Sequence, residues 1–128
     1  MLLRPATRLL LFAHGSRDPR WREPFERLEA TLRAEQGDDR VRLAYMEFVP
    51  PTFLDAAADA ERDGMTTLRV LPLFLSAGAH VAHDIPAQAD EARARHPRLA
   101  IEVLPPIGED PRFVALMKAA TTEALCRP

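Results

Sequence analysis

Short apolar runs alternate with amphipathic segments along this chain of 128 residues. An unbroken run such as Leu9 to Ala13 is typical of a strand that is buried on both faces of a parallel sheet. The apolar runs therefore predict a sheet at the centre of the fold. They lie at residues 7–13, 41–48, 67–73 and 100–104.

The segments between these runs carry helix signals. Thr52 is a candidate N-cap for a helix that Gly64 closes, and Asp84 and Asp110 each precede a first turn that contains proline. The helix that begins at Asp84 should end before Pro97, and prolines are expected only at helix ends. Apolar positions at helical spacing predict the buried faces: Trp21, Phe25, Leu28 and Leu32; Phe53, Leu54, Ala57, Ala58 and Ala60; and Phe113, Leu116, Met117 and Ala120.

The order of strand, helix, strand and helix predicts βαβ units. Their crossovers are right-handed, so the sheet should be parallel with helices on both faces. The length suits one domain and is too short for two, which predicts a single domain over residues 1–128. The predicted fold class is α/β, with three layers around a four-stranded parallel sheet.

Composition excludes several classes of function. An apolar fraction of 47% and a net charge of −2 fit an ordered globular domain with no sign of nucleic-acid or membrane binding. No apolar run is long enough to cross a bilayer, and no signal peptide stands out. Cys126 is the only cysteine, so a reducing compartment is expected, with the cytoplasm as the default. The phosphate-binding motifs and the G-x-S-x-G elbow of hydrolases do not occur, so no nucleotide cofactor is expected.

Candidate chemistry gathers where the predicted strands end. His14 follows the first strand, Glu47 lies near the end of the second, and His80 follows the third. In open α/β sheets, ligands bind beyond the carboxyl ends of the strands. Two imidazoles and a carboxylate at this edge predict a site for a divalent transition metal or a proton. Each of the three could also be a structural or solvated residue, and the residues alone leave both interpretations open.

Other polar residues near this edge have weaker assignments. Arg17, Arg20 and Arg22 place positive charge at the start of a predicted helix, where it opposes the helix dipole. A polyanionic ligand would explain this arrangement, since arginine pairs with carboxylates, and Ser16 could donate to the same ligand. The alternative is a solvated helix start. His83 could be an auxiliary ligand, a substrate contact or a solvated residue, whereas His96 and Cys126 receive no function.

The segments around the two histidines resemble one known family. Residues 11–19 (LFAHGSRDP), 72–81 (PLFLSAGAHV) and 84–86 (DIP) are similar to the CbiX/SirB family of sirohydrochlorin chelatases. These enzymes insert cobalt or iron into a tetrapyrrole, in cobalamin or sirohaem biosynthesis. The likeness covers nearly the whole chain, and one departure is Ala79, where many relatives have a second glycine.

The resemblance implies a chelatase-like fold and an activity that needs no ATP. It places metal-site and catalytic roles on His14, His80 and Glu47, with Co²⁺ or Fe²⁺ as the metal substrate, and the ligand set itself also permits Ni²⁺. It also implies a short, single-domain form that works as a homodimer around a shared cleft. The residues expected to contact a sirohydrochlorin-type tetrapyrrole are Ser16, Arg17, Arg20, Arg22, Phe74, Leu75, Ser76 and Val81.

Three functions remain to be separated at this point. The first is metal insertion, in which His14 and His80 present the metal while they or Glu47 receive the two pyrrole protons. The second is a metal carrier that uses the same residues without catalysis. The third is a chelatase for another metal or tetrapyrrole, such as nickel, because this ligand set discriminates little between cobalt, iron and nickel.

Overall fold

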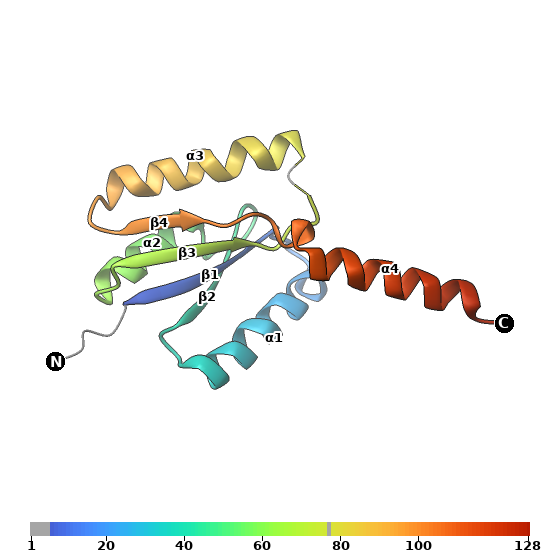
Figure 1. Ribbon diagram of the computed structural model, residues 1–128. Helices are drawn as coiled ribbons and strands as arrows, with labels where there is room; N and C mark the ends of the chain where they lie inside the picture. Colours follow the sequence, from blue (N-terminus) through green and yellow to red (C-terminus); the bar gives the residue numbers. More distant parts are fainter. Residues whose placement is uncertain (1–5, 77) are drawn as a thin grey trace.

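Four parallel strands form the central sheet of the computed structural model (Figure 1). The structure describes residues 6–76 and 78–128, without the side chains of Ala79 and His80. The strand order β2-β1-β3-β4 confirms the α/β class and the parallel sheet. The strands are β1 (Thr7–Ala13), β2 (Val41–Tyr45), β3 (Thr67–Pro72) and β4 (Ala100–Val103).

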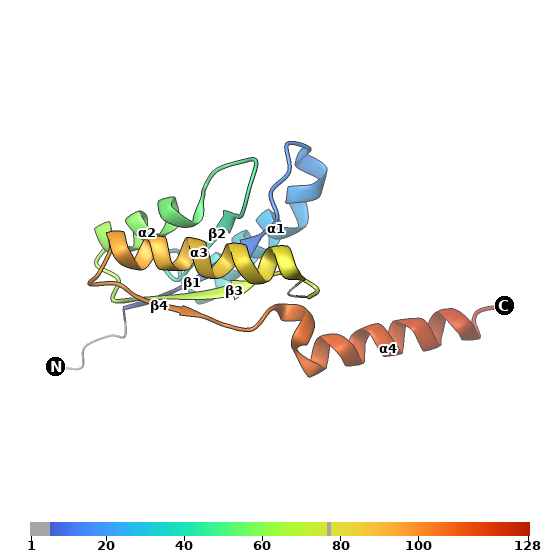
Figure 2. The same cartoon turned by 90° about the horizontal axis from the view of Figure 1, so that it is seen from above.

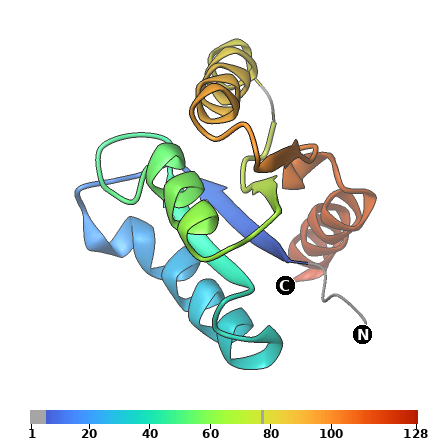
Figure 3. The same ribbon diagram turned by 90° about the vertical axis from the view of Figure 1, so that its left-hand side faces the viewer.

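Helices lie on both faces of the sheet, as Figure 3 shows from one end. Two of them, α2 and α3, pack together on one face, while α1 packs against β2 on the other. The fourth helix, α4, extends away from the sheet (Figures 1 and 2). The helices are α1 (Pro19–Gln36), α2 (Phe53–Arg62), α3 (Ala79–Arg95) and α4 (Pro111–Cys126), with a short 3₁₀ helix, η1 (Ile107–Glu109), before α4.

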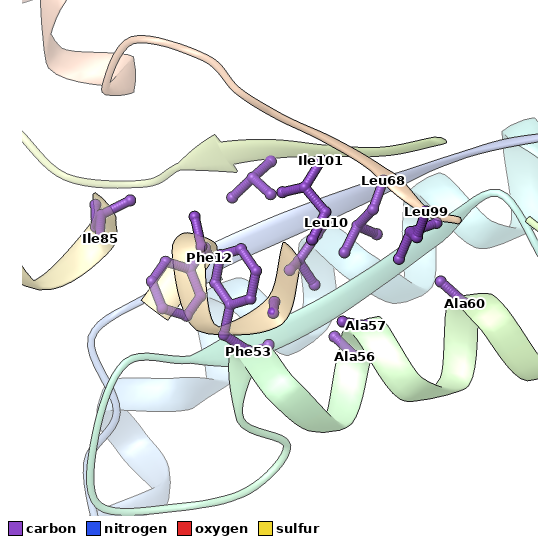
Figure 4. Close-up of a cluster of buried hydrophobic side chains, with 14 of the residues drawn as sticks. Leu10, Phe12, Phe53, Ala56, Ala57, Ala60, Leu68, Ile85, Leu99 and Ile101 are labelled. Carbon is purple, nitrogen blue, oxygen red and sulfur yellow. The ribbon is translucent and has the colours of Figure 1, made fainter. Parts of the chain in front are cut away.

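The larger hydrophobic core lies between the sheet and the pair α2 and α3 (Figure 4). Phe12 of β1 contacts Phe53 of α2 edge to face, with the ring centroids 5.2 Å apart. Alanines on α2 and α3 let both helices approach the strands closely. A smaller cluster on the other face joins alternate residues of β1 and β2 to Phe25 and Leu32 of α1.

Capping residues define where the helices begin. Thr52 accepts from the backbone N–H of Asp55, whose carboxylate accepts from Thr52 in return, which forms a capping box. Asp110 caps α4, as predicted, and Asp18 caps α1 through the N–H of Arg20. After α2, Gly64 takes a positive φ of 80°, as expected of a residue that ends a helix.

Two predictions about helix boundaries were wrong. The helix expected to begin at Asp84 begins at Ala79, with Gly78 as its N-cap. Pro86 therefore lies inside α3, and Pro24 lies inside α1, although proline was expected only at helix ends. Pro24 is the sixth residue of α1 and Pro86 the eighth of α3, so each lies beyond the first turn and removes one backbone hydrogen bond from its helix.

The predicted inner face of α4 was also wrong. No residue of α4 is buried, and Leu116 and Met117, which were expected to face the core, are exposed. The periodicity correctly predicted a helix, but it did not show that this helix extends away from the sheet. Trp21 and Leu28 of α1 are exposed as well, so only Phe25 and Leu32 pack from that predicted face. Within the described residues, no helix is both long and apolar enough to span a bilayer.

Candidate active site

The register of β1 and β2 brings His14 and Glu47 together. Ala13 is the last residue of β1 and pairs with Tyr45, the last residue of β2. The N–H of Met46 then donates to the carbonyl oxygen of Ala13 at 2.8 Å, so the two chains leave the sheet side by side. As a result, His14 and Glu47 emerge at one point of the sheet edge.

A short hydrogen bond joins these two side chains. Nδ1 of His14 lies 2.7 Å from Oε1 of Glu47, and the backbone N–H of Gly15 donates to Oε2 of the same carboxylate at 3.2 Å. With Glu47 ionised, Nδ1 carries the ring proton and donates it, which leaves the lone pair of Nε2 free. The His14 side chain is 52% exposed, so this nitrogen can accept a metal or a proton from outside.

Glycine at position 15 makes this arrangement possible. A Cβ atom there would lie 1.8 Å from the carbonyl oxygen of Glu47, far inside contact distance. The backbone after β1 therefore lies directly against the backbone after β2. The same closeness allows one carboxylate to accept from both His14 and Gly15.

The ring of Phe74 packs against the imidazole ring of His14. Its ring centroid lies 4.3 Å from that of His14, and its side chain is only 3% exposed. Phe74 and Val81 were expected to contact the tetrapyrrole, but both belong to the hydrophobic core beneath the site. Leu75, in contrast, is 69% exposed. Of these three apolar residues, Leu75 is therefore the one whose side chain is exposed enough to contact a tetrapyrrole.

The end of β3 lies next to the end of β1, at the point where the strand order reverses. The chain moves from β1 outward to β2 and then crosses to β3 on the other side, which is the position where open α/β sheets bind ligands. Ser76 is exposed here, and His80 falls in the first turn of α3. The side chain of His80 lies outside the described part of the structure, so its predicted ligand role stays a prediction.

Metal ligation can therefore be assessed only for part of the predicted set. Among the side chains that the structure describes, no three His, Cys, Asp or Glu residues gather as a metal site. His14 and Glu47 are together, and the exposed His83 lies on α3 three residues after His80. The contact of Glu47 with Nδ1 is the arrangement in which a carboxylate orients a histidine ligand.

The arginines after β1 have partners within the protein. Arg20 donates to both oxygens of Asp18, and this side-chain hydrogen bond, followed by the backbone bond from the same residue, lowers the pKa of Asp18. Arg22 donates to the carbonyl oxygen of Ser16 at 2.9 Å and pairs with Glu26. The carboxylate of Asp18 at the helix start offsets the positive charge of Arg20. The charge of Arg20 near the helix start therefore no longer indicates a polyanionic ligand. Anion binding by Arg17, Arg20 and Arg22 stays a prediction.

Arg22 also faces a separate hollow along the edge strand β2. This hollow has a volume of about 530 Å³ and is shared with Glu26 and Tyr45. Burial, and then the charge of Glu26, raises the pKa of Tyr45 to about 12. The tyrosine therefore keeps its proton at neutral pH and serves as a hydrogen-bond donor to Glu26. Ser16 is likewise engaged locally, because its Oγ accepts from the N–H of Asp18 at 3.0 Å.

Two features of the loops at the site were missed by sequence reasoning. Gly15 was quoted only as part of a motif, although its missing side chain allows the two loops to touch. Phe48 was read as strand, but it is exposed in the loop after β2 and carries a positive φ of 71°. A phenylalanine followed by valine and two prolines gives little sign of this conformation, whereas a glycine directly after a strand-end histidine is a usable signal.

The chain is similar to known proteins over nearly its whole length. The CbiX family model matches residues 8–124. A sirohydrochlorin cobaltochelatase of Sulfurisphaera tokodaii is 32% identical over 117 residues, which cover 91% of this chain and 92% of that protein. A sirohydrochlorin ferrochelatase of Bacillus subtilis is 27% identical over 106 residues, which cover 83% of this chain but 41% of the relative.

Solved structures show the same likeness. A putative cobalamin biosynthesis CbiX protein from Marinobacter aquaeolei superposes with a TM-score of 0.81 at 35% identity, over 95% of this chain and 99% of that one. The sirohydrochlorin chelatase SirB from Bacillus subtilis subspecies spizizenii, solved in complex with cobalt, gives a TM-score of 0.78 at 26% identity. This chain spans 50% of the SirB chain. The fold and the family match agree, and the chain belongs to the CbiX family of chelatases.

Proposed function

We propose that this protein is a sirohydrochlorin chelatase, which inserts Co²⁺ or Fe²⁺ into the tetrapyrrole in cobalamin or sirohaem biosynthesis. The observation that carries the proposal is the pair of His14 and Glu47, joined at 2.7 Å where β1 and β2 leave the sheet. The names of the relatives support the same reaction, since they are cobaltochelatases and ferrochelatases. Both metals are substrates of the reaction, and no nucleotide takes part.

His14 is proposed to use one nitrogen for two successive tasks. Nε2 first holds the incoming metal, while Glu47 fixes the ring through Nδ1. When macrocycle nitrogens replace Nε2 at the metal, this nitrogen is free again and accepts one pyrrole proton. The imidazolium formed in this way is stabilised by the carboxylate of Glu47. The second pyrrole proton needs another acceptor, for which His80 is the candidate.

The surroundings suit a large, flat, anionic substrate. His14 and Glu47 stand at an open sheet edge, and Leu75 and Ser76 are exposed beside them. Sirohydrochlorin carries eight carboxylates, so its rim is polyanionic while its face is apolar. Arg17, on the loop directly after His14, is available at the rim, whereas Arg20 would have to exchange its bonds to Asp18.

Metal insertion into sirohydrochlorin, followed by absorbance, tests the proposal. The wild-type protein should accelerate insertion of Co²⁺ or Fe²⁺, and His14→Ala should abolish the acceleration. Ni²⁺ is measured in parallel to rank the metals. Binding of metal without accelerated insertion would instead identify a metal carrier. Insertion with a different tetrapyrrole alone would show that the substrate assignment is wrong.

His96 provides a matched control for the histidine variant. Its Nδ1 lies 2.7 Å from Oε2 of Glu61, the same distance as in the pair of His14 and Glu47. His96 is the C-cap of α3, however, and lies at the end of the helix away from His80. His96→Ala should therefore keep its insertion rate. Equal loss in both variants would mean that the assay reports stability, which would contradict a role for His14 in catalysis.

We further propose that the protein works as a homodimer in which α4 packs on the partner. In the described part of the chain, the main contact of α4 is with η1, and its apolar residues Leu116, Met117 and Leu125 are exposed. Beside the start of α4, a hollow of about 420 Å³ is lined by Leu71, Leu104 and other residues at the ends of β3 and β4. One chain thus has both an uncovered apolar helix and an uncovered apolar hollow, which suits reciprocal exchange between two copies. The doubled length of SirB fits such a pair.

Light scattering after size-exclusion chromatography tests this assembly. The wild type should have about twice the chain mass of 14.3 kDa, and the double variant Leu116→Glu with Met117→Glu should be monomeric. Thr122→Glu on the polar side of the same helix is the control and should remain dimeric. A monomeric wild type would refute the dimer, and a dimeric double variant would place its interface elsewhere.

A further inference from the structure

The loop after β2 presents an aromatic ring to solvent beside the site. Phe48 directly follows Glu47 and is 66% exposed. Trp21, in the first turn of α1, and Leu75, in the loop after β3, are also exposed. Apart from Leu28 on α1, the other large exposed apolar residues in the described part of the chain belong to α4. Of these exposed apolar residues, Phe48 is the one that directly follows Glu47 in the chain.

The backbone holds Phe48 in an unfavourable conformation. Its φ is 71°, and the N–H of Val49 donates to the carbonyl oxygen of Glu47 at 2.9 Å, which closes a three-residue turn around Phe48. This turn is rare and strained for a residue with a bulky side chain. The loop is fixed on both sides, because Tyr45 donates to the carbonyl oxygen of Pro51 and Gly15 lies against Glu47. A strained backbone that exposes an aromatic ring at a candidate active site points to a role in binding.

Arg17 lies against this ring. Its guanidinium carbon is 5.8 Å from the ring centroid of Phe48, within the range of a cation–π contact. The loop after β1 and the loop after β2 thus combine a cation and an aromatic face. Arg17 lies over one face of the ring, and Phe48 is still 66% exposed, so the two loops offer an apolar surface directly beside a positive charge. This combination matches a flat ring that carries carboxylates on its rim.

We propose that Phe48, with Arg17 beside it, is the platform on which the face of the tetrapyrrole rests, and that it determines affinity for the macrocycle. This inference rests on the proposed function, because it assigns a binding residue to the same site. Phe48 is joined directly to Glu47, the partner of His14, so a macrocycle on this ring lies beside the group that delivers the metal. Arg17 binds a peripheral carboxylate of the same molecule. Phe48 acts by binding, and proton transfer remains with His14.

Phe48→Asn tests the platform without introducing strain. Asparagine adopts positive φ more readily than phenylalanine, so this variant should be at least as stable as the wild type in thermal unfolding. The dissociation constant for metal-free sirohydrochlorin, measured by absorbance titration, should rise about tenfold or more once the aromatic contact is lost. KM for sirohydrochlorin should rise in parallel, while kcat at saturation stays within about twofold. The reason is that the lost contact binds the substrate equally in the ground state and in the transition state. Phe48→Tyr should restore wild-type binding.

Leu28→Asn is the matched control. Leu28 is also a large exposed apolar residue, but it lies about 13 Å along α1 from the start of that helix. This variant should leave binding and insertion unchanged. In addition, Arg17→Met combined with Phe48→Asn should weaken binding less than the sum of the two single effects, because the two side chains form one unit.

The possible results separate this inference from the proposed function. If the wild type inserts metal and Phe48→Asn binds sirohydrochlorin as tightly as the wild type does, the platform is wrong and the chelatase assignment stands. If the wild type binds sirohydrochlorin without inserting metal, the chelatase assignment is wrong, and the Phe48→Asn titration still decides the platform. Failure of the wild type to bind sirohydrochlorin would overturn both.

Discussion

Replacement of Gly15 by alanine should disable the site through a backbone clash. The added Cβ would lie 1.8 Å from the carbonyl oxygen of Glu47 and 3.2 Å from Cβ of Tyr45. Ordinary contact begins near 3.4 Å, so the two loops must separate by about 1.6 Å. If this shift acts along the bond between His14 and Glu47, their 2.7 Å separation grows to about 4 Å, which is beyond hydrogen-bonding distance.

The expected effects follow from this displacement. Forced overpacking of this kind costs about 1–3 kcal/mol of unfolding free energy. Loss of the carboxylate that orients a histidine ligand lowers metal affinity or activity by about 10–100-fold. Gly15→Ala should therefore show both effects, measured by denaturant unfolding and by metal insertion into sirohydrochlorin.

Gly78→Ala is the matched control, because the same substitution there meets open space. A Cβ at Gly78 has no atom of the described residues outside its neighbours within 4 Å, and this glycine, which is the N-cap of α3, lies at the same sheet edge. Its unfolding free energy should change by less than about 1 kcal/mol, and insertion should continue. Gly15→Ala with wild-type stability and wild-type insertion would refute the close approach of the two loops. Equal loss of stability and insertion in both glycine variants would show that this edge of the sheet tolerates no substitution, whether or not it causes a clash.

Three further predictions concern other parts of the molecule. The Arg112 side chain, and then its backbone N–H, lowers the pKa of Asp110 to about 2, so this cap on α4 should persist at neutral pH. The stability it contributes should be lost only as the pH falls from about 4, the pKa of an unfolded carboxyl, through about 2. An NMR titration midpoint of the Asp110 carboxyl near 4 would contradict this. Thr52→Ala removes half of a capping box and should lower the unfolding free energy by about 1 kcal/mol in urea, whereas an unchanged value would show that the cap contributes nothing. Arg8 is fully buried, and one of its guanidinium nitrogens, Nη1, has no hydrogen-bond partner among the described residues. Arg8→Met should lower the unfolding free energy less than Arg8→Ala, because alanine also leaves a cavity, and the reverse order would refute this account.

The strands could be predicted because burial on both faces leaves a simple pattern. The first strand was placed at its observed bounds, Thr7–Ala13, because every residue from Leu9 onward is apolar. The second was predicted as far as residue 48, but it ends at Tyr45. Met46, Phe48 and Val49 are apolar in the loop as well, and hydrophobicity alone does not separate a strand from a strained turn that exposes its side chains.

The helices show where local signals fail. Thr52 and Asp110 were identified as caps because a cap depends on a few neighbouring residues. The start of α3 was displaced from Gly78 to Asp84, because glycine gives no side-chain cap to recognise and Pro86 suggested a first turn. The exposed face of α4 could not be predicted at all. An amphipathic pattern shows which face of a helix is apolar. It does not say whether that face packs on the sheet of the same chain, on another molecule or on nothing.

The two pairs of histidine and glutamate have the same contact geometry and differ in position and exposure. Both pairs have a separation of 2.7 Å between Nδ1 and a carboxylate oxygen. The side chain of His96 is 17% exposed and joins the end of α3 to Glu61 of α2, so its second nitrogen has little access to a large ligand. The side chain of His14 is 52% exposed and stands where the strand order reverses, with Phe74 beneath it. The same carboxylate contact therefore lies within the fold at His96, whereas at His14 it leaves the second nitrogen on an exposed ring, which is why we propose metal and proton transfer there.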